Sequence, residues 1–141
     1  MFSAKEDYGL RAALDLAMHV DAGPVQTHDI SRRQGIPEAY LNQILVALRR
    51  AGLVNSMRGA AGGYTLAKPP TFITAGDIIR ALRGDVLSVP GSADSAEPSA
   101  VGQLWADVRR TVQELLDGVT LSDLLENQRK IDLGLSYMAN I

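Results

Sequence analysis

The chain of 141 residues is long enough to bury the core of one domain, or of one domain with an appended arm. Its composition, with 46% hydrophobic and 21% charged residues and a net charge of −2, is ordinary for a globular protein and argues mildly against a general polyanion binder. No apolar run approaches the ~18 residues of a membrane span, and a charged N-terminus excludes a signal peptide. We therefore expect a cytoplasmic protein.

The chain also lacks cysteine, which excludes disulfides, thiol catalysis, cysteine-type zinc sites and clusters ligated by cysteine alone. Its two histidines, His19 and His28, do not stand at a metal-binding spacing. No nucleophile–base pair or cofactor loop is recognisable. The sequence therefore predicts no enzyme, no metal site and no cofactor.

Charge is distributed unevenly along the chain. Residues 31–68 hold six basic residues and one acid, whereas residues 85–130 hold eight acids and four bases. A basic head that reads DNA, joined to an acidic body, has this pattern, although chance also produces it.

Two helices are expected before residue 37. Residues 2–20 place apolar side chains on one helical face, namely Leu10, Leu14, Ala17 and Met18. Thr27 is suited to cap a short helix that ends at Gln34, and Gly35 supplies a turn with positive φ. Pro37 then opens the next helix.

Residues 38–51 form the strongest predicted helix. Its apolar stripe consists of Leu41, Ile44, Leu45 and Leu48. The opposite face carries Ala39, Gln43, Val46, Ala47 and Arg50, with Tyr40, Asn42 and Arg49 on its flanks. Gly52 ends the helix.

A hairpin of residues 53–57 and 63–67 is expected to follow, with Arg58 at its tip. Thr74 and Asp77 are spaced as a capping box for a helix that ends at Arg83. A short helix, a tight turn, a second helix and a hairpin in this order are typical of a winged helix-turn-helix. The expected fold is therefore mainly α, with a two-stranded β wing.

Residues 85–98, rich in Pro, Gly and Ser, predict a linker. Beyond it, apolar residues alternate in steps of four and three, as in a coiled-coil seam: Val101, Trp105, Val108, Val112, Leu115 and Val119. Such a seam favours a dimerisation helix over packing on the same chain's head. Thr120 and Asp123 cap a last helix. The predicted divisions are a DNA-binding domain at 1–84, the linker at 85–98, and the dimerisation and C-terminal helices at 99–141.

The outward face of the 38–51 helix has the chemistry of base reading. Asn42 and Gln43 carry amides that can pair with adenine, and Tyr40 can donate a hydrogen bond or contact a thymine methyl group. Arg49 and Arg50, at the end of the helix, suit phosphate contacts. The alternative is a core helix with a solvated polar face, but the neighbouring turn and hairpin favour DNA.

The hairpin tip supports this reading. Arg58 can enter a minor groove, and Gly59 lets the backbone approach closely. A nucleotide-binding loop would need Gly-Lys-Ser/Thr before a helix, and the Gly-x-x-Gly of an RNA-binding KH loop joins two helices. Neither arrangement is present.

Several motifs resemble the Rrf2 family of bacterial transcription regulators. They are Tyr8-Gly-Leu-Arg-Ala12, Ile36-Pro-Glu-Ala-Tyr-Leu-Asn-Gln-Ile-Leu45, Met57-Arg-Gly-Ala-Ala-Gly-Gly-Tyr64 and Ile73-Thr-Ala-Gly-Asp-Ile-Ile79. The resemblance implies a homodimer on a palindromic operator of double-stranded DNA, with Tyr40, Asn42 and Gln43 toward the major groove and Arg58 in the minor groove. Because the family contains repressors, it also implies repression.

The chain departs from cluster-binding members of that family at two places. These members have three cysteines, and often a histidine, before the Leu104-Trp105 pair, whereas Ser99 and Gly102 stand where the third cysteine and the histidine would be. The serines at 88, 92, 95 and 99 are either natural or replacements of cysteines. Iron–sulfur regulators also typically have Glu where Asn42 stands, so the operator should differ.

The sequence is compatible with two functions. The first is a dimeric, cluster-free regulator that responds to a small molecule, a partner protein or its own concentration. The second is a winged-helix adaptor that binds proteins through its acidic C-terminal half and has no DNA sequence preference.

Overall fold

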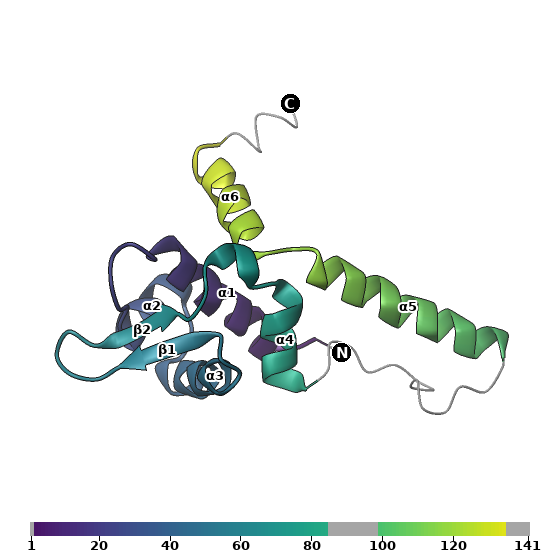
Figure 1. Ribbon diagram of the computed structural model, residues 1–141, viewed down its shortest axis with the longest axis horizontal. Helices are drawn as coiled ribbons and strands as arrows, with labels where there is room; N and C mark the ends of the chain where they lie inside the picture. Colours follow the sequence, from purple (N-terminus) through teal and green to yellow (C-terminus); the bar gives the residue numbers. More distant parts are fainter. Residues whose placement is uncertain (1, 85–98, 135–141) are drawn as a thin grey trace.

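The computed structural model describes residues 2–84 and 99–134, which form helices and one antiparallel pair of strands (Figure 1). The elements in chain order are α1 (Ala4–Met18), α2 (Thr27–Gln34), α3 (Glu38–Arg50), β1 (Val54–Met57), β2 (Gly63–Leu66), the 3-10 helix η1 (Pro70–Phe72), α4 (Ala75–Arg83), α5 (Ala100–Asp117) and α6 (Leu121–Asp132). The predicted mainly helical, winged helix-turn-helix fold is confirmed. The linker predicted at 85–98 lies outside the described residues.

The hydrophobic core lies in the head, where α1, α2, α3 and α4 pack together. The predicted stripe of α3 is buried, and Leu41, Leu45 and Leu48 are 0% exposed. These side chains belong to one cluster with Leu16 of α1 and Ile78 of α4. Burying a side chain of this size stabilises the fold by about 1.5–3 kcal/mol, so the core fixes which face of α3 points outward.

Two of the predicted helix caps are present. Thr74 Oγ1 accepts a hydrogen bond from Asp77 N at 3.0 Å, and Asp77 Oδ2 accepts one from Thr74 N at 3.0 Å. Thr120 and Asp123 repeat this capping box at the start of α6. Each box satisfies backbone donors that the first turn of a helix leaves without partners.

The prediction that Thr27 caps α2 was wrong. The helix begins one residue earlier than expected, with Thr27 inside it and Gln26 at the N-cap. The cause is the preceding residue, because Val25 pairs with Tyr64 of the wing and holds the chain extended up to Gln26. The Gln26 side chain makes no capping bond and instead reaches the wing.

The wing is a short antiparallel hairpin. β1 and β2 pair in register from Val54 opposite Leu66 to Met57 opposite Gly63. At its base, Val25 pairs with Tyr64 on the other edge of β2. The wing is thus joined both to the end of α3, through β1, and to the start of α2.

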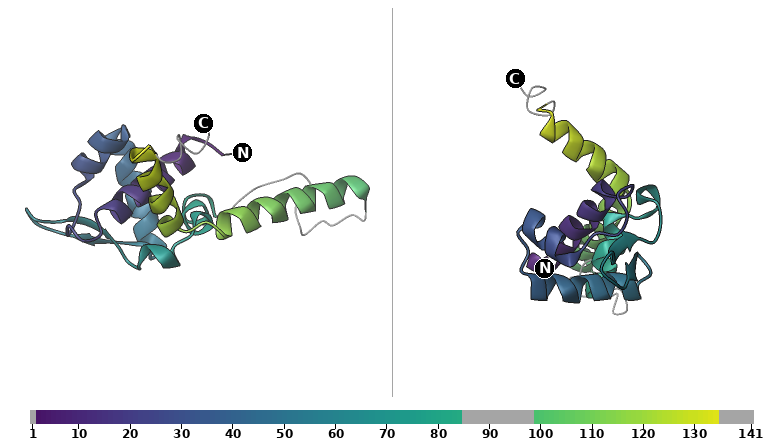
Figure 2. Two further views of the ribbon diagram at one scale, coloured as in Figure 1. Left: turned by 90° about the horizontal axis from the view of Figure 1, so that it is seen from above. Right: turned by 90° about the vertical axis from the view of Figure 1, so that its left-hand side faces the viewer.

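In contrast to the head, α5 projects away from the body of the molecule (Figures 1 and 2). It is attached through its C-terminal end, where Asp117 Oδ1 accepts a hydrogen bond from Arg80 Nη2 at 2.6 Å. Just beyond, Ala75 N donates to Val119 O at 2.8 Å. α6 then returns to pack on α1. None of the helices that the structure describes is long and apolar enough to cross a membrane.

Candidate nucleic-acid interface

The turn between α2 and α3 sets the position of the predicted recognition helix. Gly35 has φ 66°, a conformation that glycine adopts without the steric cost other residues incur. Ser31 Oγ donates to Ile36 O across the turn at 2.5 Å, and Ile36 is 2% exposed. The turn is therefore fixed by a buried side chain and a local hydrogen bond, and α3 leaves it at a defined angle.

An ion pair between a buried carboxylate and a partly exposed arginine joins α1 to α2 behind this turn. Arg33 donates to Asp15 twice, at 3.0 Å from Nε and 2.8 Å from Nη2, and Gln34 Nε2 donates to Asp15 at 3.0 Å. Burial by itself would raise the pKa of Asp15, but the hydrogen bonds from Arg33 and Gln34 and the guanidinium charge hold it below its usual value. Arg33, one of the basic residues counted from the sequence, thus holds two helices together.

The outward face of α3 carries the predicted base-reading residues. Asn42 and Gln43 are exposed, and Tyr40 is 36% exposed. The ring of Tyr40 meets Tyr8 of α1 edge to face, with 5.6 Å between centroids. This contact fixes the ring plane and leaves the phenol at the surface, where its hydroxyl can reach a ligand.

Arg49 and Arg50 lie exposed in the last turn of α3, beside the wing. Arg49 Nη1 is within 3.5 Å of Ser56 Oγ on β1, which is a weak and exposed contact. Arg49 thus lies next to the wing, and in the described chain both arginines are free of buried contacts at the end of the helix.

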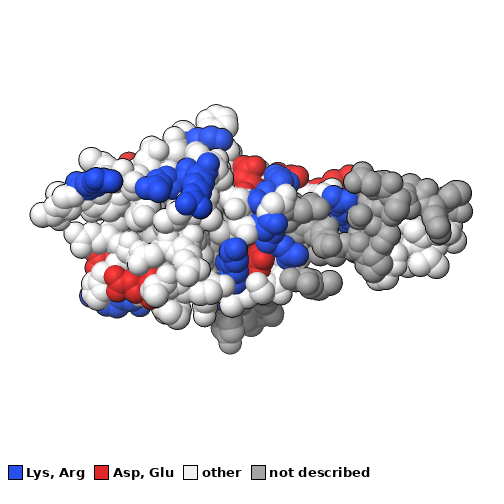
Figure 3. Space-filling view, turned by 90° about the horizontal axis from the view of Figure 1, so that it is seen from below, with Lys and Arg blue, Asp and Glu red and all other residues white. Residues whose placement is uncertain are grey.

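The wing presents the last predicted DNA contacts. Arg58 and Gly59 are exposed at the turn beyond β1, and Gly59 has φ 105°. Figure 3 views the molecule from the side on which α3 lies, and Lys and Arg side chains appear there in two groups, one toward the wing end and one near the middle of the molecule. The structure places the expected reading and phosphate-binding residues on α3 and the adjoining wing.

Sequence reasoning did not single out an acidic rim at the other end of α3. Glu38 is the first residue of that helix, Asp29 lies in the first turn of α2, and both are exposed or half-buried. His28 Nδ1 lies 3.8 Å from Glu38 Oε2. Asp29 Oδ1 in turn lies 3.4 Å from Arg32 Nη2.

The predicted dimerisation seam lies along α5. In the described chain this helix has no buried residue, and Val101 and Leu115 are each 65% exposed. Trp105, Val108, Val112 and Val119 are partly covered. An 18-residue helix with this much uncovered apolar surface lacks the packing that normally stabilises a helix in water.

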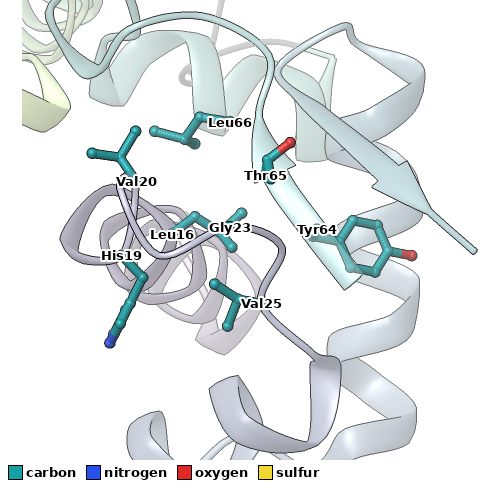
Figure 4. A pocket seen from close by; sticks show the side chains of 8 residues that line it. All are labelled: Leu16, His19, Val20, Gly23, Val25, Tyr64, Thr65 and Leu66. Atoms are coloured by element: carbon teal, nitrogen blue, oxygen red, sulfur yellow. The ribbon is translucent and has the colours of Figure 1, made fainter. Parts of the chain in front are cut away.

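A small hollow lies between the end of α1 and β2, lined by His19, Val25, Tyr64 and neighbouring residues (Figure 4). His19 Nδ1 is 2.7 Å from the backbone oxygen of Asp15, the helix-end position expected from the sequence. The hollow shows how closely the α1–α2 loop approaches the base of the wing.

The described residues do not offer a site for iron. The chain has no cysteine, and residues 2–84 and 99–134 contain no group of three histidine, aspartate or glutamate side chains close enough to hold a metal ion. Ser99, where the resemblance would lead us to expect a cysteine in a cluster-binding member, caps α5, because its Oγ accepts a hydrogen bond from Gly102 N at 3.0 Å. Hydroxyl and carboxylate oxygens are poor ligands for an iron–sulfur cluster.

Comparison with known proteins shows which family has this sequence. The pattern of the family Rrf2, described as "Iron-dependent Transcriptional regulator", matches residues 2–127. The chain is 44% identical to the HTH-type transcriptional regulator CymR of Bacillus subtilis over 86% of its length and 87% of the relative's. It is 36% identical to the HTH-type transcriptional regulator IscR of Escherichia coli, over 93% and 83% of the two chains.

Solved structures agree with these sequence matches. The structure of CymR, the global cysteine regulator of B. subtilis, superposes with a TM-score of 0.81 at 42% identity, covering 90% of this chain and 97% of that one. T. potens IscR superposes with a TM-score of 0.78 at 43% identity, covering 91% and 88%. The protein is therefore a DNA-binding helix-turn-helix transcriptional regulator and not an enzyme, and the chain belongs to the Rrf2 family.

Proposed function

We propose that this regulator acts as a homodimer on a palindromic operator, without a cysteine-ligated cluster. The observation that carries the proposal is the outward face of α3, where exposed polar side chains are followed by two arginines in the last turn, next to the wing that carries Arg58. Recognition helices that lie in the major groove pack one face against their own domain and present polar side chains on the other.

Within each half-site, Asn42 and Gln43 would read base edges and Tyr40 would contact a base or a phosphate. Arg49 and Arg50 would bind phosphates and fix the register of the protein on the duplex. Arg58, with Gly59 beside it, would enter the flanking minor groove, which attracts cations most strongly where A·T pairs narrow it.

The second half-site requires a second head, and α5 supplies the means to bring one. Its uncovered apolar seam is long enough to pack against the same helix of another copy. Because both heads would be held by one interface, operator binding by the pair is far tighter than binding by one head. The relatives' names describe regulators, and repression is the direction we propose here.

The absence of cysteine limits the signals to which this regulator could respond. Without cysteine, a small molecule, a protein partner or the concentration of the regulator itself would set its occupancy of the operator. This differs from the iron dependence in the family's description.

Selection of bound duplexes from a random DNA pool, followed by sequencing, tests the proposal. The expected result is an enriched palindrome with two half-sites about one helical turn apart, or a multiple of it. Purified protein should bind it at nanomolar concentration, with affinity that falls steeply as salt rises. Enrichment of no sequence would contradict the proposal and favour the adaptor. Enrichment of a single half-site would contradict the homodimer on a palindrome.

A further inference from the structure

A single hydrogen bond connects the tip of the wing to the helix-turn-helix. Gln26 Nε2 donates to the backbone oxygen of Ala60 at 3.2 Å, across 34 positions of sequence. Gln26 is the N-cap residue of α2, and Ala60 lies in the turn that follows Arg58 and Gly59. The bond therefore joins the helix that packs behind α3 to the loop that presents the wing arginine.

The base of the wing is fixed independently of this bond. Val25 N donates to Tyr64 O at 2.9 Å, and Tyr64 N donates to Val25 O at 2.8 Å. Both residues line the hollow of Figure 4. Gly63 has φ 145°, and a Cβ there would lie 2.4 Å from Val25 O, so the two backbones meet at a distance that only glycine allows.

Beyond this base the hairpin is exposed. Met57 is 57% exposed, and each of residues 58–61 is exposed. Among the side-chain hydrogen bonds of the described residues, the one from Gln26 is the contact that reaches the turn at 58–61 from another element. A short two-stranded hairpin without such a tie has little to hold its tip in one orientation.

We propose that Gln26 is a positioning residue, which holds the wing tip so that Arg58 meets the minor groove while α3 lies in the major groove. This inference rests on the proposed function. The side chain contacts neither groove in this role. It acts through Arg58 by fixing the distance between the wing and the helix-turn-helix before DNA binds, which removes an ordering cost from binding.

The energetic signature of this role is specific. The bond is exposed and neutral, so its loss should leave the stability of the fold almost unchanged. Its effect on operator binding should be about threefold to tenfold, the size expected for one hydrogen bond whose ordering is lost. That loss should disappear when Arg58 is absent, because there is then no side chain to position.

A double-mutant cycle on the enriched duplex tests this directly. Wild type, Gln26→Ala, Arg58→Ala and the double variant are compared by fluorescence anisotropy at one salt concentration. We expect Gln26→Ala to weaken binding about threefold to tenfold in the wild-type background and less than about twofold in the Arg58→Ala background. Gln26→Asn, which keeps the amide but is one methylene shorter, should behave as Gln26→Ala, and Gln103→Ala on α5 should have no effect.

A second measurement needs no DNA. The ¹⁵N heteronuclear NOE of the amides of residues 59–61 reports the mobility of the wing tip, and it should fall in Gln26→Ala while the NOE of α3 stays constant. Unchanged NOE values, or equal losses of affinity in both backgrounds, would overturn the inference and leave the proposed function standing. If wild type enriched no duplex, the proposed function would fail and the role assigned to Gln26 would fail with it.

Discussion

The head and α5 are built on opposite principles. In the head, each of α1 to α4 buries part of its surface against the others, and Leu41 and Ile78 are 0% exposed. α5 has no buried residue in the described chain, and Asp117 at its C-terminal end is bound to Arg80 of the head. The head thus buries its apolar side chains and exposes polar ones, whereas α5 leaves apolar side chains exposed. The first is suited to DNA and the second to another copy of the chain.

The largest difference between the two regions should appear when one leucine is truncated in each. Leu41→Ala opens a cavity in the core of the head and should lower the free energy of unfolding by about 2–5 kcal/mol. Leu104, which is 57% exposed on α5, should cost far less when truncated. Urea denaturation of dilute protein measures both, and equal losses would show that α5 is part of the same core.

The ion pair behind the turn should come next. Asp15→Asn removes the buried carboxylate that Arg33, itself about one-third exposed, binds twice. It should lower the free energy of unfolding by about 1–3 kcal/mol at neutral pH. Asp7→Asn is the matched control, because its pair with Arg11 is exposed and should be worth less than about 1 kcal/mol.

The same pair predicts a pH dependence. The pKa of Asp15 is lowered in the folded protein, so its contribution is fully present above the unfolded-state pKa of about 3.9 and is lost as the pH falls through the lowered folded value. The gap in stability between wild type and Asp15→Asn should therefore narrow below about pH 4. Denaturation curves at a series of pH values check this, and a gap that stays constant down to pH 2 would show that the pair carries no charge-dependent stability.

A charge placed on the seam should separate the functions of the two regions. Leu115→Glu should convert the dimer to a monomer and weaken binding to the palindrome about a hundredfold or more, because the second head is no longer tethered. The head should keep its thermal stability. Gln103→Glu adds the same charge on the opposite side of α5 and should change neither mass nor affinity, as light scattering and anisotropy can show.

The smallest effects should come from single reading residues. Gln43→Ala should relax base preference at one operator position and Arg58→Ala at the flanking A·T positions, each by about 1–3 kcal/mol. Arg50→Ala should instead weaken all sequences alike and lower the salt dependence. A variant-by-variant repeat of the selection distinguishes these patterns, and a uniform loss for Gln43→Ala would remove it from the reading set.

The features that could be predicted from the sequence are those defined by residues close together in the chain. The stripe of α3 repeats with the period of a helix, and the boxes at Thr74 and Thr120 lie within four residues, so both could be identified without coordinates. The outward positions of Asn42 and Gln43 followed from the same period. Their exposure is now observed, and their contact with DNA stays a prediction.

The features that were missed join distant residues. Arg33 was counted among the basic residues of 31–68, yet it pairs with a carboxylate 18 positions away, and no periodicity indicates such a pair. The link between Gln26 and the wing spans 34 positions. The pairing of Val25 with Tyr64, which displaces Thr27 from the cap of α2, spans 39. Long-range polar contacts of this kind depend on how the helices pack, which the order of residue types alone does not determine.

In the proposed complex, one head reads half of the operator and α5 brings a second head to the other half. The most direct measurement is the mass of the complex on the enriched palindrome, by analytical ultracentrifugation of wild type and Leu115→Glu. We expect two copies of the chain per duplex for wild type, and no complex for the variant at the same nanomolar concentration. One copy per duplex in wild type, or undiminished binding by the monomeric variant, would contradict the proposal.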